Sequence, residues 1–321
     1  AYSKRTSLER MTSMRKYLPY FAGLGYATIF GFSFMFTRGA LEYIAPFHLL
    51  GLRFAAAVLT LILLRLLGIV TIKVTWPQFK ALLPLAFFQP ILYFPFETLG
   101  VQLTSSSQGG MMIAAIPIFV TILAAVVLKE RPRPLQYPFI LASVGGVIFI
   151  MAMQNQGQLG ANKLGTLLLL GAVLAAACYN IASRKAGQRF SPLQTTWVMM
   201  VIGAVFFNGI ALIQHTAAGA LSQYFRPLPA IWPAVLFLGI LSSVTAFFLI
   251  NFTLSKLPAA QGAVFSNLTT LISIFAGVTF LKETIAWYQA VGALIILAGV
   301  WGTNRFAQTN AGLGEVKSCN H

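Results

Sequence analysis

Residues 104–130 read TSSSQGGMMIAAIPIFVTILAAVVLKE, an apolar run between a serine-rich turn and a Lys-Glu pair. No charged residue occurs between Thr104 and Leu128, and about 20 apolar residues are enough for a helix to cross a bilayer. The run therefore predicts a membrane span over 106–128. The whole chain of 321 residues has this character, since 58% of it is hydrophobic and 9% is charged. Soluble domains carry roughly 25% charged residues, so a soluble globular protein is excluded.

The same pattern recurs along the chain and predicts an all-α integral membrane protein with ten transmembrane helices. Proline or glycine marks several of the short connections between the runs. The spans are expected at 18–41, 46–67, 79–102, 106–128, 135–153, 164–184, 193–214, 231–254, 259–281 and 285–303.

The basic residues are distributed unevenly between the two sides of the membrane. The formal net charge is +16, yet the 22 Lys and Arg residues lie in short segments between apolar runs, which argues against a nucleic-acid partner. With the N-terminus inside, 17 of them fall in inner segments and three in outer loops. This asymmetry follows the positive-inside rule and predicts that both termini face the cytoplasm, with the chain in the plasma or inner membrane.

The run at 104–130 has a second copy later in the chain. Gln108 matches Gln261 and Lys129-Glu130 matches Lys282-Glu283, each at an offset of 153, while Arg38 matches Arg184 at an offset of 146. Five spans in each copy would insert the copies with opposite topology, an architecture typical of secondary transporters with a midplane site. We therefore expect a cytoplasmic N-terminal tail (1–17), a first repeat (18–155), a second repeat (160–305) and a cytoplasmic C-terminal tail (306–321).

Several motifs in this order resemble a known family. They are Phe30-Gly31-Phe32-Ser33-Phe34 through Pro46 to Arg53-Phe54, Leu99 through Thr104-Ser105-Ser106, Ile116-Pro117-Ile118-Phe119 and Leu128-Lys129-Glu130-Arg131, with the later part repeated over 254–283. The pattern resembles EamA-type members of the drug/metabolite transporter superfamily, including YddG-type amino-acid exporters. The resemblance implies a ten-helix secondary transporter with inverted repeats, in which helices 5 and 10 scaffold the halves and the others surround a cavity.

Helix 79–102 carries the most informative polar residues. Gln89, Tyr93 and Glu97 fall at i, i+4 and i+8 and so share one helix face. A carboxylate within a span is costly and is a functional hypothesis by default. Glu97 could couple transport to protons or bind a substrate ammonium group. Equally, it could be a structural partner of Arg38 or Arg53.

Further candidates lie on other spans. Aromatic rings and amides could stack on or hydrogen-bond to a substrate, although packing explains most such residues in membrane helices. Beside Gln89, Tyr93 and Glu97, the substrate-binding candidates are Phe34, Tyr179, Asn180, Trp197 and Asn267. Beside Glu97, the coupling or gating candidates are Arg53, Glu130 and Glu283. For Arg53 the family pattern favours a structural role, and Glu130 and Glu283 could equally be interfacial carboxylates.

No metal site and no cofactor are expected. All six acidic residues are Glu, and the absence of Asp argues against Asp-based metal chemistry. His48 and His215 lie on distant spans near the outer surface, where we expect them to be exposed and solvated. Gly146 and Gly299 allow close contacts between helices. The sequence is compatible with either a monomer or a weak homodimer.

These features predict a secondary transporter that exports small amphipathic metabolites, with amino acids including aromatic ones as the expected substrates, by alternating access. Its partners would be a small-molecule substrate and the lipid bilayer. A quaternary-ammonium or drug exporter that uses Glu97 and aromatic rings is the main alternative. A channel is a further alternative, and it would transport its substrate without counterflow. A membrane-embedded enzyme is disfavoured because the chain lacks H-E-x-x-H and an Asp pair, and the missing G-x-x-x-x-G-K-[ST] loop argues against ATP as the energy source.

Overall fold

The structure is a computed structural model that describes residues 2–127, 134–153, 161–257, 259–263 and 265–306, and this part of the chain is entirely helical, without strands. The first half contains α1 (Tyr2–Ala40), α2 (Pro46–Leu66), α3 (Trp76–Ala86), the π-helix η1 (Phe87–Leu92), α4 (Tyr93–Leu103), α5 (Ser106–Ile113), α6 (Ile116–Val127), the 3₁₀ turn η2 (Pro134–Gln136) and α7 (Tyr137–Met153). The second half contains α8 (Ala161–Ala186), α9 (Pro192–Ala217), the 3₁₀ turn η4 (Leu221–Gln223), α10 (Leu228–Leu236), the π-helix η5 (Phe237–Ala246), α11 (Phe247–Lys256), α12 (Ala259–Ala263), α13 (Ser266–Phe280) and α14 (Trp287–Arg305).

Seven helical stretches in the described residues are long and apolar enough to cross a membrane. They are Tyr17–Ala40, Pro46–Leu66, Trp76–Leu103, Ser106–Val127, Lys163–Ala186, Pro192–Ala217 and Leu228–Lys256. Shorter apolar helices occupy Pro134–Ile150, Ser266–Phe280 and Trp287–Gly302, where the sequence predicts the remaining spans. The chain is thus a multi-pass membrane protein, and the count of ten spans stays a prediction.

Local sequence explains where the spans begin. Pro46 and Pro192 are the first residues of α2 and α9, where the missing N–H of proline costs no helical hydrogen bond. Ser191 and Gln194 form a capping box at the start of α9. The Gln194 amide also donates to the Lys73 carbonyl at 2.8 Å, which ties α9 to the connection between α2 and α3.

Two spans contain π-helical segments. η1 joins α3 to α4, and within it Gln89 has φ −148° and ψ 111°, outside the helical region. Pro90 lacks the N–H that a continuous helix would use here, and the α-helix of this span is interrupted at this point. η5 joins α10 to α11 within the stretch Leu228–Lys256. Such segments change the direction of side chains within a helix and are frequent at functional sites.

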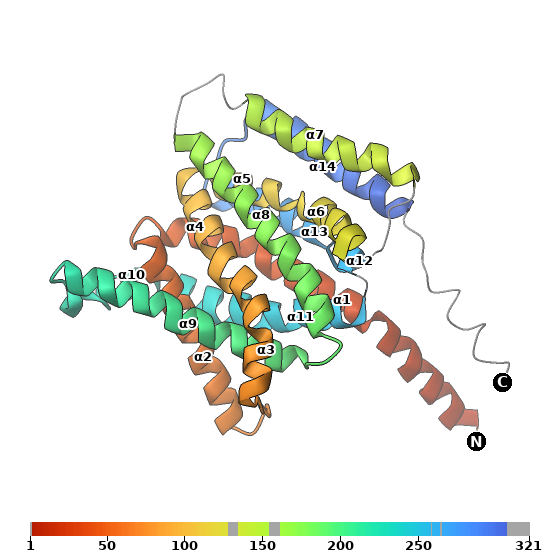
Figure 1. The fold of residues 1–321 in the computed structure, drawn as a ribbon, viewed down its shortest axis with the longest axis horizontal. Coiled ribbons are helices and arrows are strands. Elements are labelled where there is room, and N and C mark those ends of the chain that lie inside the picture. The colour runs from red at the N-terminus through yellow and green to blue at the C-terminus, as the bar shows by residue number, and fades with distance from the viewer. Residues whose placement is uncertain (1, 128–133, 154–160, 258, 264, 307–321) are drawn as a thin grey trace.

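Helices α7 and α14 form a pair along one edge of the molecule, while α8 crosses its centre (Figure 1). Small residues let the pair approach closely, because a Cβ atom at Gly146 or Gly299 would meet atoms of the facing helix. The Ser143 hydroxyl donates to the Ile296 carbonyl across this contact at 2.9 Å. These glycines therefore serve a contact within the chain.

Arginine side chains cap two of the spans in the same way. Arg38 at the end of α1 donates to the carbonyls of Val101 and Gln102, at 3.4 and 2.6 Å. Arg184 at the end of α8 donates to the carbonyls of Leu254 and Ser255, both at 3.1 Å. The arginines are related by the offset of 146 and their acceptors by the offset of 153. Each arginine satisfies carbonyls that the end of a helix leaves without a partner.

Candidate binding cavity

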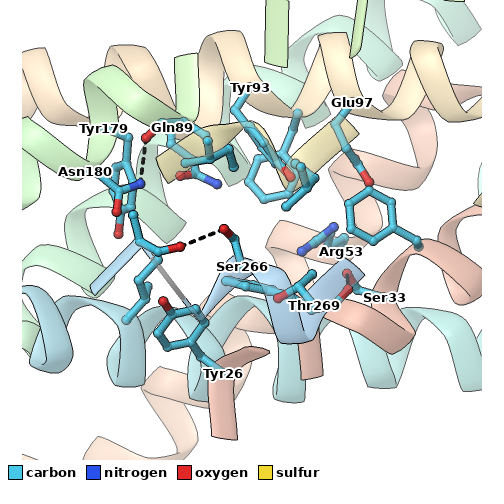
Figure 2. Close-up of a pocket in the computed structure, with 18 residues that line it drawn as sticks. Tyr26, Ser33, Arg53, Gln89, Tyr93, Glu97, Tyr179, Asn180, Ser266 and Thr269 are labelled. Carbon is cyan, nitrogen blue, oxygen red and sulfur yellow. Dashed lines mark hydrogen bonds between the residues drawn. The ribbon is translucent and has the colours of Figure 1, made fainter. Parts of the chain in front are cut away.

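A cavity lies between the central helices, and Figure 2 shows polar side chains that point into it from several of them. The first half contributes α1, α2, η1, α4, α5 and α6, and the second half contributes α8, α11, α12 and α13. The lining residues are Tyr26, Phe30, Ser33, Phe34, Arg53, Gln89, Tyr93, Phe94, Glu97, Ile113, Ile116, Ala176, Tyr179, Asn180, Ile250, Ala263, Ser266 and Thr269.

Arg53 supplies positive charge to this cavity and is held in place from behind. Its Nε and Nη2 atoms donate to the hydroxyls of Ser243 and Ser242, each at 2.8 Å, and both serines lie on η5. The guanidinium also lies 4.3 Å from the centre of the Phe94 ring, within the range of a cation–π contact. Because a guanidinium has five N–H donors, these serines leave donors available to a ligand. In Figure 2 the group points into the cavity.

Glu97 supplies the negative charge and is 3% exposed. Its Oε2 atom accepts a hydrogen bond from the Thr98 hydroxyl at 3.1 Å. In the described part of the chain, neither Arg38 nor Arg53 comes within the 4.0 Å of an ion pair with Glu97. Arg38 caps α4 instead, so the structural alternative for Glu97 lacks a direct salt bridge. Arg53 and Glu97 line one cavity without neutralising each other by contact.

Gln89 and Tyr93 line the same cavity as Glu97, as their shared helix face predicts. Gln89 is buried, although its own backbone departs from helical geometry. Despite the interruption in η1, these three side chains therefore lie on one wall of the cavity, and the direction of the Gln89 side chain is not set by regular helical geometry.

Two tyrosine hydroxyls of the cavity, those of Tyr26 and Tyr179, find partners in the protein. The Tyr26 hydroxyl donates to the Gly262 carbonyl at 2.6 Å, and the Tyr179 hydroxyl donates to Asn251 Oδ1 at 2.8 Å. Asn180 Nδ2 donates to the Ala176 carbonyl at 2.7 Å in its own helix. These rings form walls of fixed orientation, and the Asn180 side-chain carbonyl remains a potential acceptor for a ligand.

Two of the predicted substrate-binding residues lie elsewhere. Trp197 is half-buried on α9 and packs against the apolar cluster around Tyr179 and Met200, and it does not line the cavity. Asn267 also lies off the cavity lining, and its buried Oδ1 atom has no hydrogen-bond partner within the described residues. Glu130 lies outside the described residues.

Glu283 lies at one end of the bundle, apart from the cavity. Its Oε1 atom accepts the Ser106 N–H at 2.8 Å, and its Oε2 atom accepts both the N–H and the hydroxyl of Ser107. A carboxylate at a helix N-terminus satisfies free N–H groups and complements the helix dipole. This side chain therefore fastens the segment after α13 to the start of α5.

The expectation for the two histidines was wrong. His48 is 3% exposed rather than solvated, and its Nδ1 atom lies 3.0 Å from Nε2 of His215. Helices α2 and α9 pack against each other, which brings residues 167 positions apart into contact. No pattern along the sequence indicates this pairing, because it depends on which two helices are neighbours.

Hydroxyl groups of the cavity were also missed from the sequence. Ser33, Ser266 and Thr269 line it, and each donates to a backbone carbonyl: Phe30, Ala263 and Ala27, respectively. Serine and threonine are frequent in membrane helices as packing residues, so their presence alone carries little signal.

Residues 18–152 and 163–305 each match the EamA-like transporter family. The chain belongs to this family. The uncharacterized transporter YcxC of Bacillus subtilis is 41% identical over 287 residues, and the match covers 89% of this chain and 92% of YcxC. Membership makes the chain a membrane transporter of small molecules and not an enzyme.

More distant similarities extend this picture. The threonine/homoserine exporter RhtA of Salmonella typhimurium is 25% identical over 236 residues, covering 69% of this chain and 77% of RhtA. A solved crystal structure with 17% identity superposes with a TM-score of 0.61 and covers 91% of this chain and 98% of its own. That structure supports the fold alone.

Proposed function

We propose that this EamA-like protein exports small zwitterionic metabolites, namely amino acids, across the cell membrane. The observation that carries the proposal is the placement of Arg53 and Glu97 in one cavity without a direct ion pair. An amino acid carries a carboxylate and an ammonium group on one carbon. The carboxylate can therefore face Arg53 while the ammonium group faces Glu97. The similarity to a relative named as a threonine/homoserine exporter agrees with this substrate class.

Arg53 is suited to bind the substrate carboxylate. Its planar guanidinium can donate two parallel hydrogen bonds to a carboxylate, and its remaining contacts fix its orientation. Phe34, Tyr93, Tyr179 and the neighbouring rings would pack against the apolar side chain of the substrate. Gln89 and Asn180 add amide groups at the other end of the cavity. Glu97 would face the ammonium group and exchange it for a proton, which would couple export to a proton gradient.

Alternating access between two inverted repeats is the mechanism we propose. The matched arginine caps of Arg38 and Arg184 support it, because equivalent residues in the two halves make equivalent contacts. The contact between Ser143 and Ile296 joins positions that differ by the repeat offset of 153. Both termini would face the cytoplasm, and α7 with α14 would stay fixed while the other helices move. In this arrangement Glu283 would close the outer end of the bundle.

The test is transport into proteoliposomes of labelled threonine, phenylalanine and choline, with and without a pH gradient. Wild type should move the amino acids faster than choline and should respond to the gradient. Glu97→Gln should still exchange amino acids but ignore the gradient, and Arg53→Lys should transport amino acids about tenfold to a hundredfold less efficiently. Preferred transport of choline would overturn the zwitterion assignment in favour of a quaternary-ammonium exporter. Equal gradient responses of wild type and Glu97→Gln would overturn the coupling role.

A further inference from the structure

A pair of histidines joins two helices at the end of the bundle that contains the 41–45 and 218–227 connections. His48 is in the first turn of α2, and His215 is in the last turn of α9. His48 Nδ1 lies 3.0 Å from His215 Nε2, and His215 Nδ1 lies 3.3 Å from the Ala220 carbonyl. The contacts thus run from α2 through α9 into the segment 218–227.

The hydrogen-bond partners of the two rings limit how many protons the histidine pair can bind. With both rings neutral, His215 donates through Nδ1 to the Ala220 carbonyl, so its Nε2 must accept the Nδ1 hydrogen of His48. One added proton keeps the pair together when it binds to His48 Nε2, because His48 Nδ1 still donates to His215 Nε2; transfer of this shared hydrogen makes His215 the charged donor and leaves His48 Nδ1 as its acceptor. A second proton leaves no acceptor between the rings and makes both of them positive. The contact can therefore bind one proton but cannot survive two.

The backbone carbonyl of Tyr224 faces His48, and beyond it the surroundings contain little that could compensate a second charge. The Tyr224 ring centre lies 4.2 Å from that of His48 and 5.2 Å from that of His215. Its hydroxyl donates to Asn208 Oδ1 at 2.7 Å, and Asn208 Nδ2 donates to the Gly51 carbonyl at 2.9 Å. Burial raises the pKa of Tyr224, so it stays a neutral donor.

Charged groups on the packed elements are directed elsewhere. On α2, Arg53 lines the cavity, and after η4, Arg226 donates to Gln223. Glu42 at the end of α1 is exposed, and α10 and η5 contain no charged residue. In the described part of the chain, no carboxylate forms an ion pair with either histidine.

We propose that His48 and His215 form a proton-binding site that fastens α9 and the segment 218–227 to α2 and that releases them when a second proton binds. Helix α2 carries Arg53 five residues further on, so the site adjoins the helix that presents a cavity residue. In the orientation proposed above, this end faces the outside, and external acid would loosen it. That direction rests on the proposed function, whereas the titration of the pair does not.

Nuclear magnetic resonance of ¹⁵N-histidine in lipid nanodiscs tests the site directly. The chain has three histidines, so His321→Gln leaves only His48 and His215. We expect a scalar coupling between the facing nitrogens near neutral pH, its loss in acid, and proton uptake in two separated steps. His48→Gln and His215→Gln should each leave a single step for the remaining histidine. Two independent, equal titrations without nitrogen–nitrogen coupling in the His321→Gln protein would overturn the pairing.

Release is tested separately by hydrogen exchange of the amides of 218–227, corrected for the intrinsic effect of pH. The His321→Gln protein should lose protection in this segment several-fold between about pH 7.5 and pH 4, with most of the loss below about pH 5. The second proton must enter a contact that already carries one positive charge and in which the His48 ring is buried, so it binds below the ordinary range of histidine. His215→Gln should show the same low protection at both pH values. Arg226→Gln, which changes an exposed side chain of the segment, should behave like its parent. Unchanged protection in the parent across this range would overturn the release. Neither measurement involves transport, so both can be interpreted even if the protein proves not to be an exporter.

Discussion

The Glu283 carboxylate binds Ser107 twice, accepting its N–H at 2.8 Å and its hydroxyl at 2.6 Å through the same oxygen. The other carboxylate oxygen accepts the N–H of Ser106. The first residues of α5 are thereby held against the segment that follows α13. At the positions that correspond through the offset of 153, the sequence has Ala259 and Ala260, which carry no hydroxyl. The hydroxyl bond is therefore specific to one of the two related sites.

Replacing Glu283 by Gln should weaken this end of the bundle. The amide keeps one acceptor oxygen, but its NH₂ group would face an N–H donor of α5. Loss of a charge-assisted hydrogen bond typically costs about 1.5–3 kcal/mol. We expect a lower thermal unfolding temperature in detergent and faster substrate leak from proteoliposomes. Equal unfolding temperatures and equal leak would show that the carboxylate does not fasten the two segments.

Gly277→Ala should disturb the same contact from a different side. A Cβ atom at Gly277 would overlap Ser107 Oγ and the Glu283 carboxylate. We therefore expect destabilisation, although alanine is the better helix former by about 1 kcal/mol. Gly209→Ala is the matched control, because a Cβ atom there meets nothing within 4 Å and should be neutral or stabilising. The measurement is the thermal unfolding temperature of Gly277→Ala, of Gly209→Ala and of the double variant Gly277→Ala/Ser107→Ala. Equal stability of Gly277→Ala and Gly209→Ala would contradict the overlap.

Helical spacing predicted that Gln89, Tyr93 and Glu97 share one wall, and the structure places all three at the cavity. Spacing accounts for Tyr93 and Glu97, which are one turn apart on α4. It does not account for Gln89, whose backbone in η1 is not helical. Spacing does not fix how α9 is rotated against its neighbours, and Trp197 accordingly packs away from the cavity.

Contacts between distant helices were beyond the reach of sequence patterns. Ser242 and Ser243 lie about 190 residues from Arg53, and two serines in an apolar run do not indicate a guanidinium partner. The His48–His215 contact likewise needs the pairing of α2 with α9. The repeat offsets could have related Arg38 to Arg184 as caps, but only the structure shows which carbonyls they reach.

Arg53→Lys should impair transport while the protein still folds. Lysine keeps the charge but cannot bind Ser242, Ser243 and a substrate carboxylate with one planar group. We expect a fall in kcat/KM for amino acids between about tenfold and a hundredfold, which corresponds to a charge-assisted hydrogen bond. Trp197→Phe on α9 serves as the control and should transport like wild type, since Trp197 lies off the cavity lining. Wild-type kinetics for Arg53→Lys would remove Arg53 from the binding site.

Substitutions of Asn251 and Asn180 should distinguish an effect on stability from an effect on transport. Asn251 Oδ1 accepts the hydroxyls of Tyr179 and Ser183, and its Nδ2 donates to Thr196 at 3.1 Å. Asn251→Leu leaves these buried groups without partners, which costs about 1–3 kcal/mol for each group left unsatisfied. It should therefore unfold at a lower temperature.

Asn180→Leu should give the opposite result, because its described hydrogen bond is to a carbonyl of its own helix that already takes part in the helix. Its side-chain carbonyl borders the cavity, so transport should fall while the unfolding temperature changes little. Thermal unfolding and proteoliposome uptake of both variants distinguish the roles. If Asn180→Leu transports normally and Asn251→Leu unfolds like wild type, Asn180 makes no contact with substrate and the Asn251 network contributes no net stability.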